Sequence, residues 1–198
     1  MKTIVVSPKV PENIQTLVDF AHAYVIAVDS AVKKMNELGI KYNLALGDFD
    51  SLDDLSLIQS ETYRLNPIKD ESDTAKAIEM AYQKSSEVYL VGGLKGNRID
   101  HLYANLILLQ KYPRLIIMDD TNHITLKTKG TYHFFKNEYD YLSLFALEDS
   151  IISIKGVKYP LTNYVLKKDN PIGLSNEIIK EAILEIDQGS LLIIQSKD

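Results

Sequence analysis

The feature that most constrains the fold is a regular alternation of short apolar runs with amphipathic segments between residues 3 and 120. The runs Tyr24–Val28 and Val88–Val91 are apolar at consecutive positions, as expected for strands buried on both faces of a sheet. The segments Asp73–Lys84 and Ile99–Lys111 carry apolar residues at helical spacing. Strands that alternate with helices predict a parallel sheet covered by helices on both faces.

Further elements complete this first region. Strands are also predicted at Thr3–Val6, Tyr42–Leu46, Thr62–Leu65 and Leu115–Met118. Helices are also predicted at Glu12–Ala23, Ala31–Leu38 and Leu52–Ser60. Gly39 directly follows one of these helices, in the position where a helix commonly stops.

The pattern changes after Asn122, where short β-type runs are separated by turn residues. The predicted strands are His123–Lys127, Thr131–Lys136, Asp140–Leu147, Ile151–Ile154, Ala182–Ile186 and Leu191–Gln195. Only Asn176–Lys180 suggests a helical turn. Such a pattern is typical of an antiparallel β sandwich or barrel. We therefore expect an N-terminal parallel α/β domain over residues 1–122 and a C-terminal antiparallel β-sandwich domain over residues 123–198.

Charge and cysteine content narrow the class of function. The chain has a formal net charge of −5 and contains no cysteine. A net negative charge disfavours nonspecific binding to nucleic acid, and the lack of thiols excludes disulfides and thiolate metal sites. No apolar run approaches the roughly 18 residues that span a bilayer. The start is too quickly polar for a signal peptide, so we expect a cytoplasmic protein with no membrane partner.

Two carboxylates follow a buried run within the stretch Leu44–Ser51, which reads Leu-Ala-Leu-Gly-Asp-Phe-Asp-Ser. In an extended chain, residues i and i+2 point the same way. Asp48 and Asp50 are therefore expected to project together, with Phe49 on the opposite face. Two adjacent carboxylates repel each other, so they are tolerated when solvated, when they share a proton, or when a cation lies between them.

Other strand ends add polar residues at the same edge of the predicted sheet. They are Asp29 after the second strand, Lys69, Asp70 and Asp73 after a later one, and Gly92, Gly93, Gly96, Arg98, Asp100 and His101 after Val88–Val91. In an open α/β sheet, ligands bind beyond the carboxyl ends of the strands. Carboxylates beside a glycine-rich turn and basic side chains suit Mg²⁺ that bridges phosphate oxygens.

Each of these residues also has a purely structural explanation when it is taken alone. Asp29 and Asp73 stand directly before predicted helices and could be N-caps. Asp70 could form a turn, and Arg98 could make a surface ion pair of little energetic value. His101 could simply pack near a helix start. Such explanations would have to hold separately at four strand ends, which favours a binding site.

Common catalytic motifs are missing from the sequence, which has no P-loop, no Gly-x-Gly-x-x-Gly after the first strand, no Gly-x-Ser-x-Gly elbow and no zinc-spaced histidine pair. The motifs that do occur resemble the thiamine pyrophosphokinase family over most of the chain. They are Asp29-Ser30-Ala31, Gly47-Asp48-Phe49-Asp50-Ser51, Pro67 with Lys69–Asp73, the loop Gly93–His101, Gly156–Leu161 and Ser175-Asn176-Glu177.

The resemblance implies transfer of pyrophosphate from ATP to the hydroxyl of thiamine, with Mg²⁺ as cofactor, in a homodimer with sites between subunits. The implied metal ligands are Asp48, Asp50 and Asp73. The implied ATP-binding residues are Asp29, Ser51, Lys69, Asp70, Gly93, Arg98 and His101. The implied thiamine-binding residues are Asp100, Ser175 and Asn176, and the implied catalytic residues are Asp73, Arg98 and Asp100.

The chain departs from the family's usual residues at a few positions. Ala31 and Asn97 stand where glycine is usual, and Ser72 stands where threonine is common. Three alternatives remain open: another Mg-dependent pyrophosphokinase or nucleotidyl transferase at the same sheet edge, a non-catalytic nucleotide or thiamine binder, and a purely structural protein. The last of these leaves the clustered acidic residues unexplained.

Overall fold

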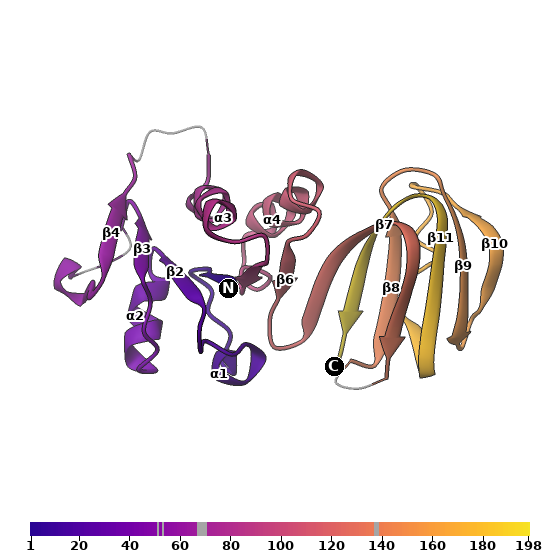
Figure 1. The fold of residues 1–198 in the computed structure, drawn as a ribbon, viewed down its shortest axis with the longest axis horizontal. Helices are drawn as coiled ribbons and strands as arrows, with labels where there is room; N and C mark the ends of the chain where they lie inside the picture. The colour runs from indigo at the N-terminus through magenta and orange to yellow at the C-terminus, as the bar shows by residue number, and fades with distance from the viewer. Residues whose placement is uncertain (51, 53, 67–70, 137–138) are drawn as a thin grey trace. The chain divides into compact units, whose positions relative to one another are not determined.

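The computed structural model describes residues 1–50, 52, 54–66, 71–136 and 139–198. The chain forms two compact units, Met1–Asp120 and Thr121–Asp198. The first is an α/β unit and the second is an antiparallel β unit (Figure 1), which is the fold class that the sequence predicts. The sequence had placed the division after residue 122.

The α/β unit is built on a parallel sheet with strand order β6-β5-β1-β2-β3-β4. The strands are β1 (Thr3–Val6), β2 (Tyr24–Val28), β3 (Leu44–Gly47), β4 (Glu61–Arg64), β5 (Val88–Val91) and β6 (Ile116–Met118). β1 is buried at every position, as a central strand of a sheet covered on both faces must be. The parallel sheet inferred from the alternating pattern is therefore confirmed.

Helices cover both faces of this sheet, with α1 and α2 on one side and α3 and α4 on the other (Figure 1). They are α1 (Ile14–Leu17), α2 (Ala31–Glu37), α3 (Asp73–Lys84) and α4 (Ile99–Lys111), with a 3₁₀ turn at Leu55–Leu57. Both ends of α3 and of α4 agree with the prediction. Among the helices of the described ranges, none has the length and apolar character that a membrane crossing requires.

Two predicted helices are much shorter than expected. The described part of Leu52–Ser60 contains only the 3₁₀ turn Leu55–Leu57. The segment Glu12–Ala23 forms only the single turn α1, because Val18 adopts extended backbone and packs its side chain into the core. In that core, side chains of β1 and β2 pack against Val32 and Met35 of α2. Apolar packing thus occupies both faces of the sheet, and polar side chains are left to the ends of the strands.

The β unit is antiparallel throughout its described pairings. Its strands are β7 (Asn122–Phe135), β8 (Tyr141–Ala146), β9 (Ser150–Val157), β10 (Leu161–Leu166) and β11 (Asn176–Ser196). β11 pairs with β7 along most of its length. On its other side, residues between Ile178 and Gln188 pair with β9, and Leu191–Ser196, together with Asn176 and Glu177, pair with β8. The register shifts between Ile186 and Ser190, where β11 changes its second partner. This exchange lets the strands enclose an apolar core.

Several boundaries in the β unit differ from the prediction. The two strands expected between His123 and Lys136 form one strand, β7. The helical turn expected at Asn176–Lys180 is wrong, since these residues begin β11, where Ile178 is buried and Ile179 is exposed. β10 was not predicted, because the polar residues Thr162 and Asn163 interrupt its apolar pattern and most of the strand is not buried.

Candidate active site

A cleft of about 650 Å³ lies at the carboxyl ends of the strands of the α/β unit. Its lining comes from the loops after β1, β2, β3 and β5 and from the first turns of α3 and α4. The volume is in the usual range for small-molecule sites. Of the predicted site residues, Asp29, Asp48, Asp73, Gly93, Arg98 and His101 line this cleft. The cleft therefore lies at the edge of the sheet where the sequence predicts a binding site.

Three carboxylates in the described part of the chain are close enough to hold one cation. Asp29, Asp48 and Asp73 each offer an oxygen, and these oxygens lie within 4.8 Å of one another. Burial, a hydrogen bond with Asp73 and the negative charge of Asp73 raise the pKa of Asp29 to about 7. The cluster is thus electrostatically strained when every carboxylate is ionised and no cation is present.

The chain reaches this arrangement through a turn and not through an extended strand. β3 ends at Gly47, and the next residues include Phe49 in left-handed backbone with φ 59°. The backbone N–H of Phe49 donates to Asp29 Oδ1 at 3.3 Å, and the N–H of Asp50 donates to Asp48 Oδ1 at 3.2 Å. The expectation that Asp48 and Asp50 project together from extended chain is therefore wrong.

This turn changes the candidate ligand set and keeps one part of the prediction. Asp50 is exposed and is not in the cluster, whereas Asp29, predicted to lie near the metal as an ATP-binding residue, is in it. Phe49 is 4% exposed and packs in the core, which agrees with the prediction that its side chain points away from Asp48. Gly47 is required by close approach, because a Cβ at this position would lie 1.8 Å from Asp29 Oδ1.

The capping explanation does not apply to either helix-proximal aspartate. Ser72 is the N-cap of α3, since its Oγ accepts from the N–H of Ala75 at 3.2 Å, and Asp73 is the first helical residue. Asp29 precedes the N-cap position of α2 and receives its hydrogen bond from the β3 loop. Both carboxylates are directed to the same cluster, which a cap would not require.

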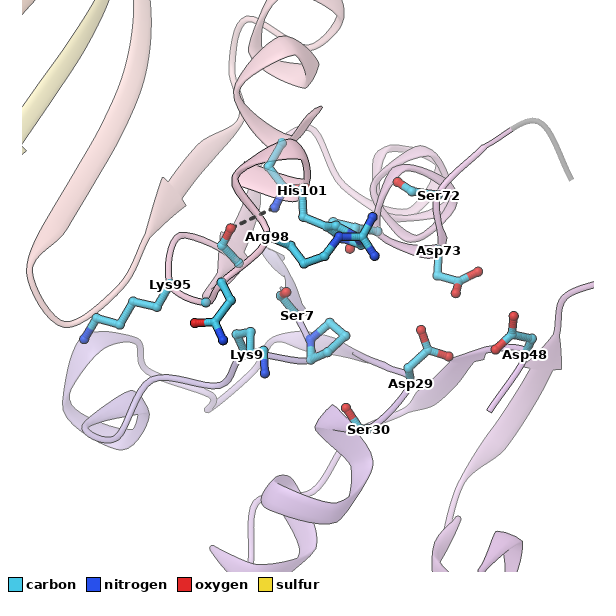
Figure 2. A pocket seen from close by; sticks show the side chains of 16 residues that line it. Ser7, Lys9, Asp29, Ser30, Asp48, Ser72, Asp73, Lys95, Arg98 and His101 are labelled. Atoms are coloured by element: carbon cyan, nitrogen blue, oxygen red, sulfur yellow. Dashed lines mark hydrogen bonds between the residues drawn. The ribbon is translucent and has the colours of Figure 1, made fainter. Parts of the chain in front are cut away.

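Basic side chains occupy the other side of the cleft. In Figure 2 the labelled carboxylates gather on the right, Lys9 and Lys95 lie on the left, and Arg98 reaches between them. Arg98 Nε contacts both oxygens of Asp100, at 3.0 and 3.2 Å. This contact lowers the pKa of Asp100 to about 2. Asp100 itself is not among the residues that line the cleft.

The glycine turn after β5 is held by a buried amide. Gly92 and Gly93 have φ 87° and 76°, in the left-handed region that favours glycine. Asn105, on α4 and 6% exposed, donates from Nδ2 to Gly93 O at 3.0 Å. A Cβ on Gly93 would lie 2.7 Å from that nitrogen. The hydrogen bond from Asn105 and the lack of space for a Cβ therefore fix the backbone position of Gly93 beside the cleft.

The remaining predicted residues lie elsewhere or outside the described part of the chain. Ser175 and Asn176 belong to the β unit, where Asn176 bonds to both backbone polar groups of Tyr159, at 3.0 and 2.8 Å. Asn176 also lines a mainly apolar cavity of about 230 Å³ within that unit. Ser51, Lys69 and Asp70 lie outside the described residues.

Sequence reasoning missed the loop after β1 and the buried amide of α4. Ser7, Pro8 and Lys9 line the cleft at the end of β1. The strand-end rule that identified the acidic residues applies equally to this first strand, so the signal was present. No sequence pattern indicates a role for Asn105, because a single asparagine within a predicted helix forms no recognisable motif.

Comparisons with known proteins agree with this architecture. The family model described as "Thiamin pyrophosphokinase, catalytic domain" matches residues 16–118, and the one described as "Thiamin pyrophosphokinase, vitamin B1 binding domain" matches residues 121–191. A curated thiamine pyrophosphokinase from Bacillus subtilis (strain 168) is 29% identical, with all of both chains covered.

Solved structures show the same fold. The crystal structure of thiamine pyrophosphokinase from Bacillus subtilis matches with a TM-score of 0.88 at 27% identity, and all of both chains are covered. A thiamin pyrophosphokinase family protein from Enterococcus faecalis matches with a TM-score of 0.86 at 27% identity, also over all of both chains. The catalytic-domain model alone covers more than half of the chain. The chain therefore belongs to the thiamin pyrophosphokinase family.

Proposed function

We propose that the cleft binds ATP with Mg²⁺ and that the protein transfers pyrophosphate from ATP to the hydroxyl of thiamine, giving thiamine diphosphate and AMP. The observation that carries this proposal is the meeting of Asp29, Asp48 and Asp73 opposite basic side chains at one edge of the sheet. Membership of the thiamin pyrophosphokinase family supports the reaction.

The donor set of the acidic cluster fits Mg²⁺. Magnesium prefers oxygen ligands and commonly takes one or two carboxylates together with water and substrate phosphates. Asp29, Asp48 and Asp73 supply carboxylate oxygens within 4.8 Å of one another, and their mutual repulsion favours a bound cation. When bound, the ion supplies charge neutralisation at the phosphate oxygens.

The chain's own residues would then position the reactants. Pyrophosphoryl transfer asks a protein mainly for alignment and for neutralisation of charge. Arg98 presents a guanidinium group to the cleft. The Gly92–Gly93 turn brings its backbone close to the interior of the cleft. In-line attack of the thiamine hydroxyl on the β-phosphorus expels AMP.

The hydroxyl proton needs an acceptor, for which Asp73 and Asp100 are candidates. Asp73 lines the cleft, whereas Asp100 does not. Arg98 lowers the pKa of Asp100 to about 2, which makes this carboxylate a weak base. Both observations favour Asp73 as the acceptor.

Thiamine recognition and assembly are further parts of the proposal. We assign thiamine contacts to Ser175 and Asn176 of the β unit. We also expect a homodimer, in keeping with an exposed apolar stripe on α4, where Ile99, Tyr103 and Ile107 are 76%, 64% and 46% exposed. Size-exclusion chromatography with light scattering tests the dimer directly. The lack of cysteine fits the reducing cytoplasm in which we expect the protein to act.

The decisive experiment is to incubate the protein with ATP, Mg²⁺ and thiamine and to separate the products by chromatography. We expect thiamine diphosphate and AMP in equal amounts, and none of either after metal chelation. ADP as the nucleotide product would indicate a different phosphoryl transfer. Equal turnover with unrelated alcohols would support a less specific pyrophosphokinase. Thermal stabilisation by both ligands without any product would identify a non-catalytic binder.

A further inference from the structure

The cationic side chains of the cleft differ in how far their charge is already neutralised. Within the described ranges, Lys9, Lys95 and Arg98 are the lysine and arginine side chains that line the cleft. Lys95 Nζ lies 3.0 Å from Asp120 Oδ2, and Arg98 is paired with Asp100. Lys9 is exposed and has no ion pair with any residue in the described part of the chain.

The stem of Lys9 is held against the glycine-rich loop that follows β5. Its Cγ, Cδ and Cε lie 3.8, 4.0 and 3.5 Å from the position that a Cβ on Gly96 would take. Its backbone carbonyl oxygen lies only 2.3 Å from the corresponding position at Gly92. Glycine at both positions therefore lets the Lys9 loop and the β5–α4 loop pack together. A lysine whose stem is already packed loses less conformational freedom when its ammonium group binds a ligand.

A nucleoside triphosphate stays negatively charged after one divalent cation binds. A single cation held by the acidic cluster therefore neutralises only part of the charge on the phosphates. Arg98 and Lys95 already face carboxylates of the protein. We propose that Lys9, from the loop after β1, is a phosphate-binding residue of this cleft and supplies the ammonium group that contacts the nucleotide's phosphate chain. This inference rests on the proposed binding of ATP, and it adds a contact from a loop outside the family motifs found in the sequence.

Calorimetric titration of the full-length protein tests the role of Lys9 without requiring turnover. Lys9→Met keeps an unbranched stem and removes the charge. We expect this variant to weaken ATP binding in the presence of Mg²⁺ by about tenfold, since a charge-assisted hydrogen bond is lost. Adenosine, which has no phosphate, should bind equally to both proteins. Lys9→Arg should restore most of the ATP affinity, and the salt dependence of ATP binding should be weaker in Lys9→Met.

Two controls keep the test specific. Lys33→Met removes an exposed lysine of α2 that does not line the cleft, and it should leave ATP binding unchanged. Thermal unfolding of each variant shows that the fold is intact. ATP affinity of Lys9→Met within about twofold of wild type, or an equal loss for adenosine, would overturn the assignment of Lys9. Failure of the wild-type protein to form thiamine diphosphate would instead overturn the proposed reaction, and the binding comparison would still decide the role of Lys9.

Discussion

The two units of the molecule use polar side chains in different ways. In the α/β unit, the strands β1, β2 and β3 are apolar and almost entirely buried, and Asp29, Asp48 and Asp73 stand just beyond the structural core. In the β unit, Asn176 hydrogen-bonds to the backbone of Tyr159 and also lines a cavity. Candidate functional groups of the first unit thus lie outside the apolar core, although Asp29 also fixes the turn at Phe49. In the second unit, the proposed thiamine contact Asn176 is itself part of the backbone hydrogen-bond network.

The difference explains why the α/β unit can hold three carboxylates close together. The parallel sheet supplies stability through its apolar faces, so repulsion at its edge costs only part of that stability. Substitutions at the acidic cluster should therefore affect activity more than folding. Substitutions at close backbone contacts of the β unit should affect folding first.

The largest expected effect is on turnover by Asp48→Asn. This change removes one carboxylate of the cluster, and we expect the rate of AMP release to fall by about a hundredfold or more. The midpoint of urea unfolding should stay close to that of wild type. Asp50→Asn is the matched control, because Asp50 is a neighbouring exposed aspartate outside the cluster. An equal loss in both variants would contradict the ligand set proposed here.

The next prediction compares two glycines that have no room for a side chain. A Cβ on Gly47 would lie 1.8 Å from Asp29 Oδ1, and a Cβ on Gly156 would lie 1.8 Å from the carbonyl oxygen of Glu181. Gly47→Ala should displace a cluster side chain and reduce turnover by about tenfold to a hundredfold. Gly156→Ala meets backbone and also has φ 77°, so it should destabilise the protein by about 2–4 kcal/mol.

Parallel measurements of turnover and urea unfolding on both glycine variants decide this comparison. If Gly47→Ala lost mainly stability and Gly156→Ala lost mainly turnover, the separation of function from scaffold in the α/β unit would be wrong. Turnover should be expressed per folded molecule, because a destabilised variant contains fewer of them.

The smallest expected effect concerns the metal-free protein. Its free energy of unfolding should depend on pH in opposite directions through Asp29 and His123. Burial and Asp73 raise the pKa of Asp29 from 3.8 to about 7. The stability that this group contributes is full below the unfolded pKa of 3.8 and is lost as the pH rises from there to the folded pKa of about 7. Burial lowers the pKa of His123 below 6.5. Its contribution is full above the unfolded pKa and is lost as pH falls.

Urea unfolding of the metal-free protein between about pH 5 and pH 8 separates the two groups. Asp29→Asn should abolish the decline of stability that occurs as the pH rises from about 5 to about 7. His123→Phe should abolish the decline at the acidic end. Mg²⁺ should stabilise the wild type most at the alkaline end, where the cluster is ionised. A loss of stability with rising pH that persists in Asp29→Asn would assign it to another group.

Much of the α/β unit could be predicted, because its signals are local. α3 and α4 were predicted at both ends, since each combines apolar periodicity with clear boundaries. The strand-end rule found all three carboxylates of the acidic cluster. The rule failed at Asp50, because the chain leaves β3 in a left-handed turn at Phe49, and this turn depends on a hydrogen bond that the Phe49 N–H donates to the distant Asp29.

The β unit was harder to predict because its pairings are nonlocal. Asn163 has φ 47° at a register shift in β10, and this edge strand exists through its pairing with β9. β11 looked like separate pieces, because Asp187, Gln188 and Gly189 interrupt its apolar pattern. No local feature shows that the strand continues through this irregularity with β7 beside it.

β11 also affects the order in which a growing chain can fold. The parallel sheet is complete once β6 has left the ribosome, so the α/β unit can close early. β7, β8 and β9 all pair with β11, so none of them has its full set of neighbours until residues 176–196 have been synthesised. A chain whose synthesis stops before β11 therefore exposes unpaired strand edges, which makes it a target for chaperones, proteases and aggregation.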